Sequence, residues 1–302
     1  MTNSVLITGA SGLVGSRLTE LLTQKGYRVS HLGRKKRTGT IPSFVWNVER
    51  GELDAAALQN IDVIIHLAGT GVADKRWNAE HKKDILESRT KSGTLLFEAL
   101  KNNSHHVKTV ISASGIGYYG YQNSPIPLSE ESLPGDDFLA QVVVDWEKSV
   151  DAIQSLGIRV VKIRIGIVLS GKGGALVEIA RPVRLGVGSP LGSGKQMMSW
   201  IHLDDTCEIF IKAVEEQSMT GSYNAVAPHP ATNQEITRQI GKVLKRPLWL
   251  PHVPAFVLRV VVGEMASVVL NGAIISSEKI QMTGFQFQFP QLDKALENLL
   301  RK

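Results

Sequence analysis

The alternation of short apolar runs with longer amphipathic segments constrains the fold of this chain most strongly. In the first half of the sequence, β-branched runs of strand length are separated by segments with helical periodicity. This order is typical of β–α–β units and therefore of a parallel sheet. The predicted strands span residues 4–8, 28–32, 44–46, 63–67, 108–112 and 159–163, and the predicted helices between them span 13–24, 79–101 and 138–155. Because the strands are nearly continuous in Val, Ile and Leu, we expect a doubly wound α/β sheet with helices on both faces.

The second half of the chain has a different texture. Glycines are scattered from residue 170 to Trp200, which is typical of loops around a site. Helices are predicted at 204–216, from Asn233 behind a capping box of Thr232 and Glu235, at 255–270, and at 290–300. The apolar stretch 253–270 is expected to be a buried helix. We expect a dinucleotide-binding domain of residues 1–169, to which 200–226 return, and a smaller, mostly helical substrate lobe of residues 170–199 and 227–302.

A glycine-rich turn provides the most specific local motif. Residues 8–15 read Thr-Gly-Ala-Ser-Gly-Leu-Val-Gly and lie directly between a predicted strand and a predicted helix. Glycines at such a turn let the backbone approach a pyrophosphate, and the helix N-terminus offers it free N–H donors. The first two glycines are one residue further apart than in G-x-G-x-x-G, and a simple turn is the alternative interpretation. The motif predicts a Rossmann-type nucleotide site with contacts from Gly9, Ser11, Gly12, Leu13, Val14 and Gly15.

The residues after the second predicted strand indicate which nucleotide binds. Sites for NAD carry an acidic residue here for the ribose 2′-hydroxyl. This chain instead reads Gly-Arg-Lys-Lys at 33–36. Arg34 and Lys35 would neutralise a 2′-phosphate, and the Arg34 fork can bind it bidentately. The sequence therefore predicts NADP, with a solvated basic loop as the alternative.

These motifs, together with Asp-Val-Ile-Ile-His-Leu-Ala-Gly at 62–69, resemble the extended short-chain dehydrogenase/reductases, the NAD-dependent epimerase/dehydratase family. The resemblance extends to about residue 215. The segment 251–287 resembles an atypical, sugar-nucleotide epimerase-like subgroup that carries a C-terminal domain of unknown function. The resemblance implies that Ser114 takes the active-site serine position. It also implies cofactor contacts from Leu67, Ala68, Gly69, Ile165, Gly166 and Val168.

One departure from that family bears directly on activity. Its standard members move a proton with a tyrosine whose pKa is lowered by a lysine four residues later. No Tyr-x-x-x-Lys occurs in this sequence, and matching places Leu139 and Val143 at the two positions. Neither side chain can transfer a proton. Two hypotheses stay open: an NADP-dependent oxidoreductase or epimerase-like enzyme acting on a small or nucleotide-linked polar substrate, and a non-catalytic NADP sensor.

Other polar residues are candidates for the missing roles. Tyr118 is the candidate proton donor, with Ser114 as its hydrogen-bond partner. Tyr119 is a candidate substrate contact, and Arg89 a candidate cofactor contact. For an anionic substrate group, the candidates are Arg181, Arg184 and Lys195, with solvent-facing loop charges as the alternative.

Several partners are not expected. The net charge of +6 invites a nucleic-acid hypothesis, but basic residues form only brief clusters, as at 34–37 and 82–83, and no nucleic-acid-binding motif accompanies them. No apolar run reaches the roughly 18 residues of a membrane span. A metal at His202, Asp204 and Asp205 is not expected, because Asp204 or Asp205 would instead cap the helix that begins there. With one cysteine, Cys207, and no secretory pattern at residues 1–4, we expect a cytoplasmic monomer or homodimer.

Overall fold

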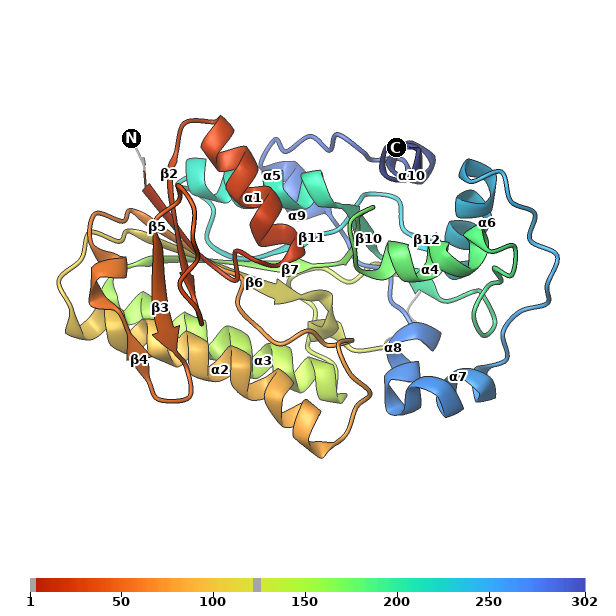
Figure 1. Cartoon of the computed structure of the whole chain (residues 1–302), viewed down its shortest axis with the longest axis horizontal. Coiled ribbons are helices and arrows are strands. Elements are labelled where there is room, and N and C mark those ends of the chain that lie inside the picture. Colours follow the sequence, from red (N-terminus) through yellow and green to blue (C-terminus); the bar gives the residue numbers. More distant parts are fainter. Residues whose placement is uncertain (1–3, 122–125, 302) are drawn as a thin grey trace.

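An eight-stranded sheet forms the centre of the larger part of the molecule (Figure 1). The computed structural model describes residues 4–121 and 126–301. The strand order is β11-β7-β6-β5-β1-β2-β3-β4, and every neighbouring pair is parallel except β3 and β4. The order reverses at β1, and sheets of this kind bind ligands outside the carboxyl ends of the strands at such a point, here β1, β2 and β5. The strands are β1 Ser4–Thr8, β2 Arg28–Gly33, β3 Ser43–Asn47, β4 Glu52–Leu53, β5 Val63–His66, β6 Thr109–Gly115, β7 Arg159–Ile165 and β11 Gly221–Ala225.

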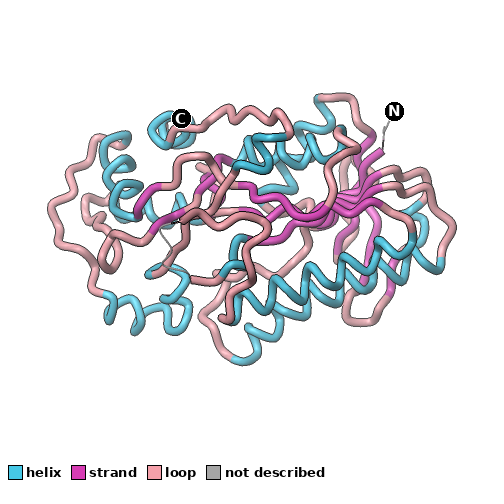
Figure 2. The backbone as a smooth tube through the Cα atoms, turned by 180° about the vertical axis from the view of Figure 1, so that it is seen from behind, coloured by secondary structure: helices cyan, strands magenta, loops and turns pink. Residues whose placement is uncertain are grey.

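Helices cover both faces of this sheet, as Figures 1 and 2 show. α1 (Leu13–Gln24) and α5 (Leu203–Glu215) pack together on one face, and α2 (Ala79–Asn102) and α3 (Phe138–Asp151) on the other. Every residue of β1 and of β5 is buried, as expected for strands covered on both sides. The predicted doubly wound sheet is confirmed. The helix predicted to reach residue 155 ends at Asp151 and continues as a 3₁₀ turn, η3 (Ala152–Leu156).

A smaller, mostly helical part follows around a second hydrophobic cluster. The predicted capping box at the start of α6 is confirmed, because Thr232 Oγ1 accepts from Glu235 N at 3.2 Å and Glu235 Oε2 accepts from Thr232 N at 2.7 Å. Its helices are α4 Ala175–Arg184, α6 Asn233–Val243 and α10 Leu292–Leu300, and its strand pairs are β8 Ile167–Leu169 with β10 Trp200–His202 and β9 Met197–Met198 with β12 Ala231–Thr232. Three further short helices lie elsewhere in the chain: η1 Ala55–Leu58, η2 Ile116–Tyr119 and α9 Glu278–Met282.

The prediction of one buried helix over 253–270 is wrong. The chain forms α7 (Ala255–Val262), a 3₁₀ turn η4 (Gly263–Met265) and α8 (Ala266–Leu270). Gly263 has φ +66°, a left-handed conformation that interrupts the helix. No residue of α7 is buried, and Phe256 and Val260 are 67% and 72% exposed. In Figure 1, α7 and α8 lie beyond the end of the sheet, where few neighbouring elements can cover them.

The predicted cap of α5 is also wrong. His202 is the N-cap residue, and its Nδ1 accepts from Asp204 N at 3.0 Å. Asp204 pairs with Arg17 Nε at 2.7 Å. Asp205 is fully buried and accepts backbone N–H groups from the segment that leads into α10. Both carboxylates therefore bind other elements.

The described helices include none with the length and apolar character needed to cross a membrane. Within residues 4–121 and 126–301, no group of three His, Cys, Asp or Glu side chains could hold a metal ion.

Candidate functional site

The glycine turn lies at the carboxyl end of β1, and sterics fix its composition. Gly9 has φ +66°, and a Cβ there would lie 2.8 Å from the carbonyl carbon of Leu67. A Cβ on Gly15 would lie 2.5 Å from the Gly9 oxygen. Gly12 is exposed, its N–H bonds to the Gly9 oxygen at 3.0 Å, and α1 begins directly after it. The turn is therefore tight where it meets β5 and open at the N-terminus of α1, the arrangement that accommodates a pyrophosphate.

A buried hydroxyl joins this turn to the end of β5. Thr8 Oγ1 accepts from the N–H groups of Leu67 and Ala68 at 3.0 and 3.1 Å. Its own proton is therefore donated to His66 Nδ1 at 2.8 Å. Burial, with a smaller contribution from the charge of Arg89, lowers the pKa of His66 to about 4, so the ring is neutral at pH 7. This network fixes the predicted cofactor-binding segment 67–69 beside the glycine turn.

Arg89 lies beneath that segment. Its Nη1 donates to the carbonyl oxygens of Thr70 and Ile85, both at 2.9 Å. Its Cζ lies 5.1 Å from the Trp146 ring centroid, and a Cβ on Gly69 would lie 3.2 Å from that Cζ. Burial lowers the pKa of Arg89 to about 10, so the side chain keeps its charge at pH 7. Arg89 thus supports the loop after β5, and its contact with a cofactor stays a prediction.

The basic pair after β2 lies at the same edge of the sheet. β2 ends at Gly33 and is the direct neighbour of β1, so Arg34 and Lys35 begin the loop beside the glycine turn. Both residues are exposed. The carboxyl end of β2 therefore carries positive charge where a ribose bound at the turn would lie.

Ser114 lies near the end of β6, and its hydroxyl points into the protein. Ser114 Oγ donates to Glu147 Oε1 at 2.6 Å. Arg164 binds the same carboxylate with two parallel bonds, Nε to Oε1 at 2.8 Å and Nη2 to Oε2 at 2.9 Å. Burial opposes both charges, but the hydrogen bonds and attraction between them lower the pKa of Glu147 and raise that of Arg164.

Sequence analysis did not select Glu147 and Arg164 as site residues. The available signal was two charged residues at alternate positions, Lys162 and Arg164, among the Val and Ile residues that follow Arg159 in β7. A strand covered on both faces buries such charges, and buried charges need partners. α3 provides these partners: Lys162 binds Asp151 at 2.7 Å, and Arg164 binds Glu147.

The two tyrosines of η2 have different surroundings. Tyr119 is fully buried, donates to Asn224 Oδ1 at 2.7 Å and accepts from Arg164 Nη1 at 3.1 Å. Burial raises the pKa of Tyr119 to about 12. Tyr118 is half-buried, and its ring centroid lies 3.4 Å from Arg164 Cζ, so the guanidinium lies against the ring face. Of the two, Tyr118 is the one that reaches the surface.

The residues that match the family's tyrosine and lysine positions are apolar neighbours of η2. A Cβ on Gly117 would lie 3.4 Å from Leu139 Cβ and 3.8 Å from Val143 Cγ2. Leu139 and Val143 therefore pack against the backbone at the end of β6.

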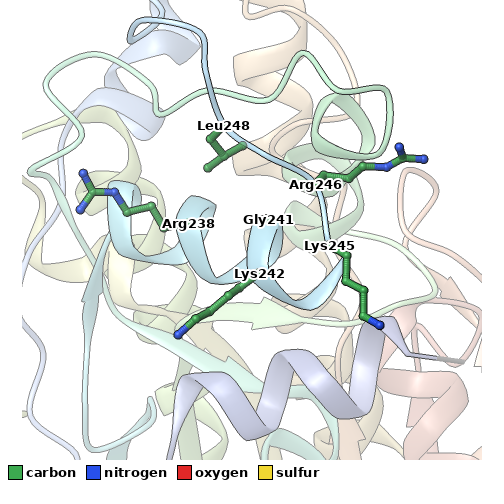
Figure 3. Close-up of a pocket in the computed structure, with 6 residues that line it drawn as sticks. All are labelled: Arg238, Gly241, Lys242, Lys245, Arg246 and Leu248. Carbon is green, nitrogen blue, oxygen red and sulfur yellow. The ribbon is translucent and has the colours of Figure 1, made fainter.

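The basic residues predicted to bind an anionic substrate are all exposed and are not gathered into one cavity. Arg184 lines a cavity of about 300 Å³ with Arg17, Lys172 and Asp204. Arg181 lies one turn earlier on α4, and Lys195 lies in the loop before β9. A second cavity of about 390 Å³ lies at the end of α6, and Figure 3 shows its basic side chains pointing away from one another. It is lined by Arg238, Gly241, Lys242, Lys245, Arg246 and Leu248.

Two family models together match most of the chain. Residues 5–226 match the NAD dependent epimerase/dehydratase family, and residues 253–299 match a domain of unknown function, DUF1731. The chain is 35% identical over 301 residues to an epimerase family protein of Mycobacterium bovis, covering 98% of this chain and 97% of the relative. It is also 35% identical over 301 residues to epimerase family protein SDR39U1 of Mus musculus, covering 98% and 99%.

Solved structures show the same relationship. The human epimerase family protein SDR39U1 (isoform 2), crystallised with NADPH, is 32% identical and superposes with a TM-score of 0.88 over 99% of both chains. A nucleoside-diphosphate sugar epimerase from Corynebacterium glutamicum is 30% identical with a TM-score of 0.80, covering 99% of this chain and 58% of that one. The chain therefore belongs to the NAD dependent epimerase/dehydratase family, in a branch similar to SDR39U1 that carries the C-terminal DUF1731 domain.

Proposed function

We propose that the protein binds NADPH and acts as an NADP-dependent oxidoreductase or epimerase-like enzyme on a small or nucleotide-linked polar substrate. The observation that supports this most directly is the exposed Arg34 and Lys35 beside the glycine turn, in place of the carboxylate of NAD sites. The NADPH in the related human structure is consistent with this choice of cofactor.

Different residues of the chain would bind the cofactor and transfer the proton. The turn at 9–15 and the N-terminus of α1 hold the pyrophosphate, and Arg34 with Lys35 binds the 2′-phosphate. When bound, the reduced nicotinamide would supply a hydride to the substrate carbon. Tyr118 donates a proton to the substrate oxygen, because its phenol is the half-buried one at the carboxyl end of β6.

Nucleotide affinity tests the cofactor assignment. Only the 2′-phosphate gives charge-assisted bonds to Arg34 and Lys35, so we expect NADPH to bind about tenfold to several hundredfold more tightly than NADH. The preference should shrink as salt is added. Arg34→Asp should invert it, because the carboxylate repels the phosphate and accepts a bond from a 2′-hydroxyl.

Calorimetric titration of both nucleotides measures these affinities. Arg246→Asp, which makes the same change of charge at the end of α6, is the matched control and should leave the ratio unchanged. Equal affinities of the wild type for the two nucleotides, or an unaltered ratio in Arg34→Asp, would show that Arg34 does not contact the cofactor.

A non-catalytic NADP sensor is the second candidate function, and Leu139 with Val143 favours it. These residues put two apolar side chains against η2, at positions where the family's standard members carry the proton-transfer pair. Incubation with NADPH and a panel of nucleotide sugars and small ketones distinguishes the two functions. Steady oxidation of NADPH would exclude the sensor. Tight NADPH binding without hydride exchange across the panel would support it.

A further inference from the structure

We propose that Arg164 is a positioning residue that places a buried positive charge against the face of Tyr118, and that Glu147 and Ser114 hold it there. The inference rests on the proposed role of Tyr118 as proton donor. It adds the cation that a phenol needs for that role and that neither Leu139 nor Val143 can supply.

The contact geometry is that of a stacked cation and ring. Arg164 Cζ lies 3.4 Å from the centroid of Tyr118 and 5.2 Å from that of Tyr119. Arg164 itself is 3% exposed, so water screens the interaction little. A desolvated guanidinium over an aromatic face is favourable, and it stabilises negative charge that develops on the ring oxygen during proton transfer.

The carboxylate of Glu147 fixes the plane of that guanidinium. Arg164 Nε and Nη2 donate to the two oxygens of Glu147, which lies on α3, at 2.8 and 2.9 Å. Arg164 Nη1 donates to the Tyr119 hydroxyl at 3.1 Å. Because all three guanidinium nitrogens are hydrogen-bonded, the group has little freedom to turn, and its face stays against the Tyr118 ring. Lysine could give the charge at this position, but not the planar stack or the bidentate pairing.

Ser114 acts through this pair. Its register partner in the sheet is Arg164, and both side chains reach Glu147 on the same side of the sheet. The 2.6 Å bond from Ser114 Oγ orients the carboxylate that orients the guanidinium. In this arrangement Ser114 supports Tyr118 indirectly, rather than through a bond from its own hydroxyl to substrate.

Nitration of tyrosine by tetranitromethane tests the proposal without any substrate, because the reagent attacks the phenolate. Peptide mapping by mass spectrometry would give the nitration rate at Tyr118, with Tyr27, which lies before β2, as the reference within the same chain. In Arg164→Met, the rate at Tyr118 relative to Tyr27 should fall about three- to thirtyfold, because a nearby positive charge stabilises the phenolate more than the neutral phenol. Arg164→Lys, which keeps a positive charge, should recover part of the lost nitration rate at Tyr118.

A purely structural role for Arg164 gives the opposite result. Loss of a packing residue would loosen η2, expose Tyr118 and raise its nitration, so an increased or unchanged ratio in Arg164→Met overturns the proposal. That variant leaves the buried Glu147 carboxylate without its bidentate partner, with Lys162 Nζ at 3.5 Å as its remaining charged neighbour, and this loss can prevent folding. The combination Arg164→Met with Glu147→Gln removes both charges, and the same fall is expected there.

The nitration experiment tests the role of Arg164 independently of the proposed enzymatic function. Nitration needs neither NADPH nor turnover, so it reports on Arg164 even if no cofactor binds. If the ratio falls as expected but Tyr118→Phe leaves turnover unchanged, the proton-donor assignment is wrong while the coupling of Arg164 to Tyr118 stands.

Discussion

Burial determines the protonation state of the histidine at the end of β5. His66 is fully buried, accepts a hydrogen bond from Thr8 at Nδ1, and has Nε2 within 3.2 Å of Ser92 Oγ. Since Nδ1 accepts, the proton lies on Nε2 and is donated to Ser92, whose Oγ in turn bonds to the Arg89 carbonyl. A second proton on the ring would have no acceptor in this network. The neutral ring is thus part of what holds segment 67–69 in place.

The low pKa of His66 predicts how the stability of the folded protein depends on pH. The pKa of His66 is about 4 in the folded protein and near 6.5 unfolded, so its contribution is fully present above pH 6.5. It is lost as pH falls toward 4, by up to about 3 kcal/mol. Urea unfolding at pH 7.5 and 4.5 should show a larger loss for wild type than for His66→Gln. His106→Gln, at an exposed site, is the control and should lose as much free energy of unfolding between pH 7.5 and 4.5 as the wild type does. A loss in His66→Gln as large as that of the wild type would show that His66 is not the group responsible.

Apolar side chains are buried on one helix of the smaller part and exposed on another, more apolar one. α6 buries Ile236 and Ile240 in the second hydrophobic cluster, whereas α7 has no buried residue. The distinction depends on neighbours: α6 packs against α4 and α10, and α7 mainly against the short turn η4 and helix α8 that follow it. Apolar side chains on α7 therefore contribute little transfer free energy to folding.

Matched truncations on these two helices test the difference. Val260→Ala should change the free energy of unfolding by less than about 0.5 kcal/mol, because the side chain is already in solvent. Ile240→Ala should cost about 2–5 kcal/mol, through lost burial and the cavity that it leaves. Denaturant titration gives both values. A cost above 1 kcal/mol for Val260→Ala would mean that α7 is covered in solution, for instance by a second copy of the chain.

At the scale of the whole molecule, one buried carboxylate connects the C-terminal segment to the helix that precedes the last strand of the sheet. Asp205 on α5 accepts from the N–H groups of Gln288 and Phe289 at 2.7 and 3.0 Å. Phe289 also stacks on His202, with ring centroids 3.9 Å apart. These contacts anchor the chain before α10, which then packs on α6 in the smaller part.

Removal of that carboxylate should loosen the C-terminal segment. Asp205→Ala leaves two N–H groups without their acceptor, and each such loss costs about 1–3 kcal/mol. We expect faster proteolytic cleavage between α9 and α10, together with a lower melting temperature. Asp204→Ala is the control, because the partly exposed pair with Arg17 is worth about 1 kcal/mol or less. Equal effects of the two changes would show that Asp205 does not anchor the segment.

The sequence by itself determined the features that depend on local pattern. Strand and helix periodicity predicted six of the seven parallel strands, all but β11, and the helices between them, because both periods are set by the backbone geometry of the element itself. The glycines at 9, 12 and 15 and the basic pair at 34–35 were likewise predicted, since each motif is a short segment between adjacent elements. The glycine turn and the basic pair therefore lie where the sequence places them, between adjacent elements, and their contacts with a nucleotide stay a prediction.

Only the tertiary structure decided which distant side chains meet. His202 caps α5, so the Asp205 carboxylate is free to accept a hydrogen bond from the N–H of Gln288. The two residues are 83 positions apart, and no local sequence pattern predicts their contact. Ser114 matched a family serine, yet it faces Glu147, because the partner of a strand residue depends on which helix covers that face of the sheet. The pairing of Glu147 with Arg164, and the exposure of α7, arise in the same way. Burial and ion pairing depend on neighbours brought together by folding, and a single sequence does not specify those contacts.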